Sequence, residues 1–258
     1  MGRTIAIANQ KGGVAKTTTA VNLSTGIAML GKKVLLIDID PQGNATSGLG
    51  VDRKNINKCI YDVLVNGVSL DKVVIPTNID NLSVLPSTIQ LAGAEVELVS
   101  VISREVRLKK AIDNIKKDYD YIFIDCPPSL GLLTLNSLTA ADSILIPIQC
   151  EYYALEGLSQ LMSTIKLVRK HLNEDLDIEG VVMTMFDART NLSNQIVDEV
   201  KEHFKEKVFA SIIPRNVRLS EAPSFGKPGI IYDPKSKGSE MYKQLAKEVV
   251  ENEYKKIG

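Results

Sequence analysis

A lysine- and glycine-rich segment, placed between an apolar run at 4–8 and a helical pattern at 17–30, constrains the fold more than any other feature. Its residues are Asn9, Gln10, Lys11, Gly12, Gly13, Val14, Ala15, Lys16, Thr17 and Thr18. Backbone N–H groups of such a loop can point at a phosphate, and glycines let the main chain approach it. Lys16 can supply positive charge, and Thr17 can offer its hydroxyl to Mg²⁺. We predict a phosphate-binding loop between a strand and a helix.

The common phosphate-loop pattern, G-x-x-x-x-G-K-[ST], is not matched strictly, because Gln10 stands at the first glycine position and Ala15 at the last. Taken alone, the segment also fits a Gly-rich strand-to-helix turn without chemical importance. Glycine can adopt a positive φ in such a loop, whereas a Cβ would crowd the phosphate. We therefore expect Ala15 to impair the nucleotide site.

Strand and helix patterns alternate along the chain. After the loop we predict further strands at 33–39, 82–85, 119–124, 143–148, 180–186 and 208–213. We predict helices at 17–30, 59–65, 91–99, 104–117, 155–172 and 193–204, and from 238 a helix docked on the core. This alternation favours an α/β fold with a doubly wound, mostly parallel sheet and helices on both faces. Its ligand site should lie at the carboxyl ends of the strands.

Length and composition fit one domain, 1–258, with a large core. Hydrophobic residues make up 44% and charged residues 24%, which argues against disorder. No apolar run is long enough for a bilayer and no signal peptide is evident, so we expect a cytoplasmic protein. Three scattered cysteines, Cys59, Cys126 and Cys150, predict buried free thiols, and two isolated histidines, His171 and His203, receive no function.

Overall charge does not identify a partner, because 31 basic residues balance 31 acidic ones. Between Lys205 and Lys247, however, nine Lys or Arg residues stand against four Asp or Glu residues. This local surplus of five fits phosphate contacts with a nucleic acid, and it also fits a solvated basic face.

Two carboxylates follow apolar strands and are candidates for metal and water handling. Asp125 closes the run 121–124 as the carboxylate of a Walker B element does, and it would hold Mg²⁺ directly or through water. Asp40, which we place at the end of the strand next to the loop, would orient an attacking water toward a γ-phosphate. For Asp38 we favour a turn-forming role, with a role in the site's network left open.

Six blocks in fixed order carry a family resemblance. They are K-G-G-V-A-K-T-T at 11–18, D-I-D-P-Q-G-N at 38–44, D-C-P-P-S-L-G at 125–131, Q-C-E-Y-Y-A-L-E-G at 149–157, D-A-R-T at 187–190 and P-R-N-V-R-L-S-E-A-P at 214–223. Together they resemble the ParA/Soj family of chromosome-partitioning ATPases, within the MinD/ParA deviant Walker A group of P-loop NTPases. That family has glycine where this chain has Ala15.

The resemblance implies an enzyme that binds ATP or ADP with Mg²⁺ and hydrolyses ATP slowly. It implies an ATP-dependent face-to-face homodimer that binds double-stranded DNA non-specifically and is reset by a ParB-type centromere-binding protein. By this resemblance Lys11 is the signature lysine that reaches the partner subunit's nucleotide, while Lys16 and Asp40 act within their own subunit. Arg189 and Arg218 would contact DNA, and the protein would be associated with the nucleoid.

The adenine would lie, by the same resemblance, at Pro214 and Asn216, with Met185 stacking nearby. Three alternatives remain open. A MinD-like ATPase would use a membrane surface through a basic amphipathic C-terminal helix. An iron–sulfur carrier would need paired cysteines at a dimer interface, which the three scattered ones do not offer. A non-catalytic interaction protein would have lost nucleotide handling because of Ala15.

Overall fold

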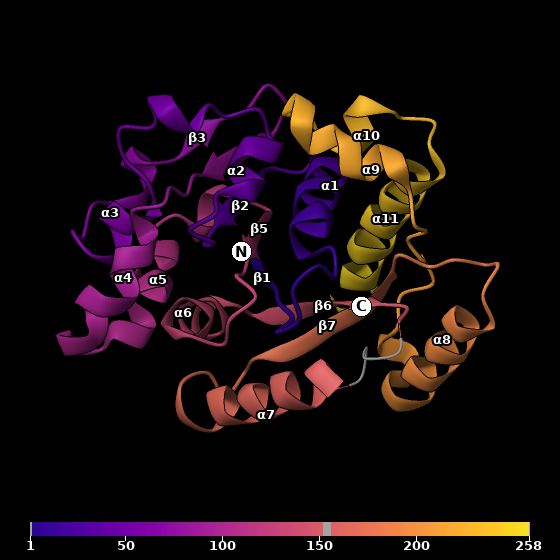
Figure 1. Ribbon diagram of the computed structural model, residues 1–258. Coiled ribbons are helices and arrows are strands. Elements are labelled where there is room, and N and C mark those ends of the chain that lie inside the picture. The colour runs from indigo at the N-terminus through magenta and orange to yellow at the C-terminus, as the bar shows by residue number, and fades with distance from the viewer. Residues whose placement is uncertain (1, 152–155, 258) are drawn as a thin grey trace.

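Among the residues that the computed structural model describes, 2–151 and 156–257, seven strands form one sheet in the order β3-β4-β2-β5-β1-β6-β7 (Figure 1). The strands are β1 Arg3–Ile7, β2 Val34–Asp38, β3 Ile75–Pro76, β4 Leu82–Leu85, β5 Tyr121–Asp125, β6 Ser143–Gln149 and β7 Asp177–Thr184. All neighbouring strands are parallel except β3 and β4. The prediction of a doubly wound, mostly parallel sheet is confirmed.

Helices lie on both faces of this sheet (Figure 1). Their bounds are α1 Lys16–Met29, α2 Asn44–Gly48, α3 Ile60–Leu64, α4 Leu91–Glu97, α5 Arg107–Asp113, α6 Leu132–Ala140, α7 Glu156–His171, α8 Asn191–Phe204, α9 Val217–Glu221, α10 Gly229–Tyr232 and α11 Lys237–Ile257. Short 3₁₀ turns include η1 Arg53–Asn55, η4 Arg104–Val106, η5 Lys116–Asp118 and η7 Ala222–Phe225.

Alternation along β2 divides the core into two apolar clusters. Leu35 and Ile37 join the cluster beneath α3 to α8, whereas Val34 and Leu36 join the one beneath α1, α10 and α11. Successive side chains of a strand point to opposite faces, so the two clusters lie on opposite sides of the sheet. All five residues of β2 are buried, as expected of a parallel strand covered on both faces.

The C-terminal helix docks on the core as predicted. Tyr242, Leu245 and Val249 of α11 are each 0% exposed, and the Tyr242 hydroxyl lies 3.0 Å from that of Thr19 in α1. None of the helices in the described ranges is long and apolar enough to cross a membrane. All three cysteines are free and buried, as predicted.

The strand predicted at 208–213 is not formed. This segment runs beside β7, where Phe209 N donates to Val181 O at 2.9 Å and Ile213 N to Met183 O at 2.8 Å. Between these points the N–H of Ser211 turns to the carboxylate of Glu248 in α11, at 3.3 Å. A side chain from a distant helix therefore interrupts the ladder, and only isolated bridges remain.

The helix predicted at 104–117 is also broken, because only Arg107–Asp113 is α-helical, between η4 and η5. Asn136 of α6 explains its late beginning: its amide oxygen accepts the N–H of Leu108 at 3.2 Å, and its amide nitrogen donates to Arg104 O at 2.9 Å. These bonds replace the first turn of the helix. The helices α2, α6, α9 and α10 were not predicted, and residue 155, the predicted start of α7, lies outside the described residues.

Candidate nucleotide-binding site

The carboxyl ends of β1, β5 and β2 meet beside the predicted phosphate loop. β5 pairs with both neighbours, so that Asp125 lies opposite Ile7 of β1 and Asp38 of β2. The prediction that Asp40 ends the strand next to the loop is therefore wrong, because β5 separates β2 from β1. Asp40 lies two residues beyond β2, yet it lines the same cavity as the loop.

The loop has the open backbone that close approach of an anion requires. Gly13 has a φ of 75°, and a Cβ added at Gly12 or Gly13 would meet nothing within 4 Å. Lys16 begins α1 and is only 7% exposed, with its Nζ donating to the carbonyl oxygen of Lys11 at 2.9 Å. Burial lowers the pKa of Lys16, while the neighbouring carboxylate of Asp125 opposes that shift. A buried ammonium at a helix N-terminus is well placed to meet phosphate charge.

Ala15 occupies the conformation that a glycine would favour. Its φ of 65° and ψ of 31° are left-handed, immediately before the first residue of α1. An L-residue with a Cβ takes this conformation at a cost of roughly 1 kcal/mol or more. The backbone has therefore kept the glycine-type turn with a methyl group added to the wall of the site.

Two buried side chains that the sequence did not single out hold the loop in place. The Asn9 amide accepts the N–H of Lys11 at 3.0 Å and donates to Pro147 O in β6 at 2.8 Å. The Thr184 hydroxyl, at the end of β7, lies 3.2 Å from the carbonyl of Val14. The Val14 side chain is itself 2% exposed. Val14 can therefore contact a phosphate only through its main chain. No sequence pattern predicted the long-range contacts of Asn9 and Thr184.

Asp125 and Thr17 fit a divalent cation. The Asp125 side chain is completely buried, and neither of its carboxylate oxygens has a hydrogen-bond partner within normal distance among the described residues. Burial raises the pKa of Asp125 well above its usual value, and the negative charges of Asp38 and Asp40 add to the shift, while the nearby Thr17 hydroxyl opposes it. Unpartnered carboxylate oxygens beside a hydroxyl are the donor set that Mg²⁺ prefers.

Asp38 belongs to a buried network rather than to a simple turn. Its carboxylate accepts the N–H and the hydroxyl of Thr46 in α2, at 2.8 and 2.7 Å, and the N–H of Asp40 at 3.2 Å. The Thr46 hydroxyl in turn accepts the N–H of Ser87 at 3.0 Å. Burial raises the pKa of Asp38 to about 6, although the bonds from Thr46 oppose this shift. The network ties α2 and the segment after β4 to the loop that carries Asp40.

The loop carrying Asp40 is further fixed by its own turn. One carboxylate oxygen of Asp40 accepts the N–H of Gln42 at 2.9 Å, and the Arg53 guanidinium donates to Gln42 O. Gly43 has a φ of 62°, and a Cβ there would lie 2.9 Å from Ser87 O. Asp40 thus stands on a rigid loop, with a carboxylate that remains partly exposed.

A cavity of 570 Å³ brings most of the predicted nucleotide-site residues together. Those that line it are Gly12, Gly13, Ala15, Lys16, Thr17, Thr18, Asp40 and Met185. A smaller cavity of 160 Å³ shares Ala15, Thr18 and Met185 with it and also contains Pro214 and Asn216. The residues predicted for the adenine therefore adjoin those predicted for the phosphates. Asn216 also caps α9, accepting the N–H of Arg218 at 2.9 Å.

Five predicted residues do not line these cavities: the buried Val14 and Asp125, and also Lys11, Arg189 and Arg218. The Lys11 ammonium has no hydrogen-bond or ion-pair partner in the part of the chain that the structure describes. Arg189, with 86% of its side chain exposed, pairs with Asp187 at 2.6 Å. Arg218 pairs with Glu221 at 2.9 Å and with Asp233 at 3.5 Å. Both pairs are open to solvent and are screened by salt, so phosphates can compete with the acidic partners for these arginines.

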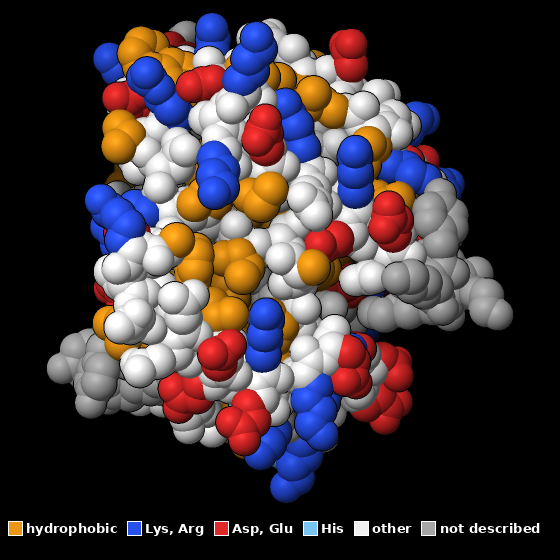
Figure 2. All heavy atoms as spheres, turned by 90° about the vertical axis from the view of Figure 1, so that its right-hand side faces the viewer, with side chains coloured by type: hydrophobic (Ala, Val, Ile, Leu, Met, Phe, Trp, Pro, Cys, Tyr) orange, Lys and Arg blue, Asp and Glu red, His pale blue; other side chains and the backbone are white. Residues whose placement is uncertain are grey.

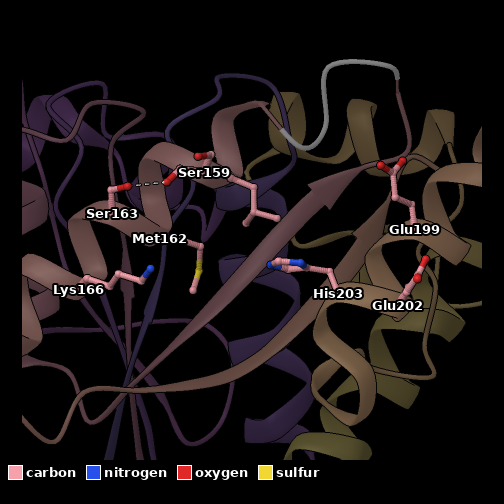
Figure 3. Close-up of a pocket in the computed structure, with 8 residues that line it drawn as sticks. Ser159, Met162, Ser163, Lys166, Glu199, Glu202 and His203 are labelled. Atoms are coloured by element: carbon pink, nitrogen blue, oxygen red, sulfur yellow. Dashed lines mark hydrogen bonds between the residues drawn. The ribbon is translucent and has the colours of Figure 1, made fainter.

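A second cavity of 570 Å³ lies between α7 and α8 (Figure 3). In the close-up, Met162 of α7 and His203 of α8 extend into the space between the two helices, and Lys166 approaches from the α7 side. None of the predicted phosphate-site residues lines it. The cavity beside the β1–α1 loop, which holds the buried lysine and the open backbone, is the better candidate for a nucleotide.

The strand order, the two-lysine loop after β1 and the carboxylate at the end of β5 define a class: a P-loop nucleotide-binding protein of the deviant Walker A type. A family model described as an AAA domain matches residues 2–178. The sporulation initiation inhibitor protein Soj of Bacillus subtilis is 64% identical over 252 residues, which are 98% of this chain and 100% of that protein. The chain belongs to the Soj/ParA family of chromosome-partitioning ATPases.

Solved structures agree with this assignment. Cobyrinic acid a,c-diamide synthase from Mycobacterium smegmatis, with bound ADP and magnesium, is 38% identical with a TM-score of 0.85, covering 97% of this chain and 94% of that one. The septum site-determining protein MinD from Pyrococcus horikoshii, complexed with Mg-ADP, is 27% identical with a TM-score of 0.80, covering 96% of each chain. The predicted family and fold are confirmed.

Proposed function

We propose that this chain is an ATP-dependent switch for chromosome partition. ATP holds two copies face to face, the dimer binds double-stranded DNA without regard to sequence, and slow hydrolysis, stimulated by a ParB-type protein, resets it. One observation carries the proposal: an open phosphate loop, a buried lysine and a partly exposed carboxylate line one cavity, and the unpartnered buried carboxylate of Asp125 lies beside Thr17 in its wall. The place of action would be the cytoplasm, on the nucleoid.

Each residue has a defined task in hydrolysis. Backbone N–H groups of Gly12 to Thr18 and the Lys16 ammonium bind the β- and γ-phosphates. Thr17 and Asp125 would hold Mg²⁺, which would neutralise phosphate charge. Asp40 orients the attacking water from its rigid loop. Phosphoryl transfer needs mainly positioning and charge neutralisation, and one subunit supplies these groups for its own nucleotide. The remaining positive charge is the Lys11 ammonium of the second copy in the dimer.

Dimerisation is supported by Lys11. Its carbonyl is occupied by Lys16 of the same chain, while its ammonium is left without a partner among the described residues. A second copy that presents its nucleotide to this face would supply the missing anion. The predicted DNA contacts, Arg189 and Arg218, lie on the exterior, where phosphates can compete with their solvent-exposed acidic partners.

No specific observation favours the other functions. The apolar side chains of α11 that a membrane-binding helix would need are packed on α1. Within the described residues no group of His, Cys, Asp and Glu side chains could hold a metal ion by itself, which offers an iron–sulfur centre no support.

Substituting Lys11 tests the proposal. In light scattering with excess ATP and Mg²⁺, Lys11→Ala should stay monomeric while the wild-type chain dimerises. Its stimulated hydrolysis should fall by about a hundredfold or more. Nucleotide affinity of the monomer should change little, because the Lys11 side chain lies outside its own cavity. Lys170→Ala, on the exposed side of α7, is the matched control. A dimeric and fully active Lys11→Ala protein would refute the assignment.

A further inference from the structure

Phe225 is the outlier among the phenylalanines of this chain. It is 62% exposed at the end of η7, whereas Phe123, Phe204 and Phe209 are buried and Phe186 is half-buried. Val217, at the start of α9 and beside Arg218 in the chain, is 70% exposed. Single exposed apolar residues are ordinary, so the meaning of Phe225 depends on its surroundings.

Those surroundings connect Phe225 to the candidate DNA contact. Its ring stacks on that of Tyr232, with centroids 5.0 Å apart and planes inclined by 24°. The Tyr232 hydroxyl lies 3.5 Å from the Glu221 carboxylate, which pairs with Arg218 at 2.9 Å. The exposed ring and the Arg218 guanidinium therefore belong to one side-chain cluster.

The backbone that presents the ring is rigid. Gly226, with a φ of 61°, meets Gly50 so closely that a Cβ on it would lie 3.1 Å from the Cα of Gly50. A Cβ on Gly50 would lie 2.9 Å from Gly226 O. The N–H groups of Gly226 and Lys227 are bonded back to Pro223 O and Ala222 O, at 3.0 and 3.2 Å. A ring held out on such a turn loses little freedom when it binds a partner.

The segment that carries the ring has a surplus of positive charge. Residues 215–237 contain five basic and two acidic side chains, and both acids pair with Arg218. Lys227, Lys235 and Lys237 are exposed, and no ion pair is found for them in the described part of the chain. On the face that carries α8 to α11, lysine and arginine side chains stand among hydrophobic ones instead of forming an unbroken basic surface (Figure 2).

We infer that Phe225 is an apolar contact to double-stranded DNA beside the phosphate contact of Arg218. This inference rests on the proposed function and adds a residue and a mode of contact to it. Basic side chains fix a protein on the phosphates, while an apolar side chain can press on a deoxyribose or wedge at a base step in the minor groove. DNA is favoured over a lipid surface because α9 has only five residues and offers no long apolar face.

The salt dependence of DNA binding separates the two kinds of contact. Wild-type protein with ATP and Mg²⁺ is titrated against a fluorescent duplex of random sequence at several salt concentrations, with dimerisation measured in parallel. Phe225→Ala should bind about fivefold more weakly at every salt concentration, with an unchanged salt slope. Arg218→Ala should reduce the slope by about 0.9, because one phosphate contact is lost.

Two further variants sharpen the comparison. Ile102→Ala removes a side chain that is 91% exposed at another place and should bind DNA as the wild type does. Phe225→Trp keeps an aromatic ring and should restore most of the affinity. The inference is overturned if Phe225→Ala binds DNA normally, if its defect is matched by lost dimerisation, or if it reduces binding to anionic phosphatidylserine vesicles instead. A wild-type dimer that binds no DNA would instead refute the proposed function itself.

Discussion

Replacing Ala15 by glycine should improve both the stability and the nucleotide affinity of this protein. The residue lies at φ 65°, ψ 31°, where a Cβ costs roughly 1 to 2 kcal/mol and glycine costs almost nothing. Glycine also gains freedom in the unfolded chain, which removes about 0.4 to 1 kcal/mol of that benefit. The expected net gain is therefore about 0.5 to 1 kcal/mol in the free energy of unfolding, measured on the ligand-free protein in urea.

Nucleotide affinity is a separate measurement on the same pair of proteins. Ala15 lines both the phosphate cavity and the smaller adjoining one, so it lies where a nucleotide that occupied both would cross from one to the other. Removing the methyl group should tighten ATP binding, measured by calorimetry, and raise the hydrolysis rate. Equal affinity and equal hydrolysis in Ala15→Gly would refute the view that Ala15 impairs the site.

Two control variants test the reasoning about backbone strain. Ala92→Gly, on the exposed side of α4, has no positive φ to relieve and should destabilise the protein by about 1 kcal/mol. Gly13→Ala would place a Cβ in open space at φ 75°, so its cost should come from the backbone alone and be about 1 kcal/mol. If Ala15→Gly destabilises as much as Ala92→Gly does, the left-handed conformation carries no strain.

Further predictions concern the network beneath Asp40. Thr46→Val removes the hydroxyl that joins Asp38 to Ser87, and this change should lower kcat about tenfold with little change in KM. Thr46→Ser keeps a hydroxyl and should retain activity. Equal kcat in the two variants would contradict a positioning role for Thr46. Because the folded-state pKa of Asp38, about 6, exceeds the usual 3.8, its contribution to stability is complete below pH 4 and is lost as pH rises through 6. The loss from Asp38 should be roughly 3 kcal/mol in the ligand-free protein, and chemical unfolding of Asp38→Asn should show a smaller loss over this pH range, with the remainder due to the raised pKa of Asp125.

The sequence predicted correctly those elements that depend mainly on residues close together in the chain. The loop, α1 and the strand ending in Asp125 depend on neighbouring residues, and the structure has all three. The place of Asp40 depends on strand order, which no local pattern encodes, and β5 was therefore missed as the strand beside the loop. The segment at 208–213 has strand composition, but the carboxylate of Glu248, 37 residues from Ser211, takes the N–H that a strand would use.

The role of Asp38 shows the same division. The sequence favoured a turn-forming role for Asp38, and only the folded chain brings Thr46 and Ser87 to it. Asn9 and Thr184 hold the phosphate loop through contacts with β6 and with the end of β7, and neither belongs to a recognised spacing. Polar residues buried by tertiary contacts leave no periodic signal, so sequence reasoning finds the ligand's contacts more readily than the groups that position them.

Several unfavourable features converge on the candidate site. Asp125 is buried with unpartnered oxygens, Asp38 is buried beside it, and Ala15 and Met185 both have positive φ at the cavity wall. Each costs free energy in the ligand-free chain, and strain of this kind persists where the surrounding structure enforces it. A cation on Asp125 and phosphates on Lys16 would relieve the electrostatic part of this cost. Ligand binding should therefore stabilise the folded state strongly. The site is therefore built for its ligand at the expense of the empty protein.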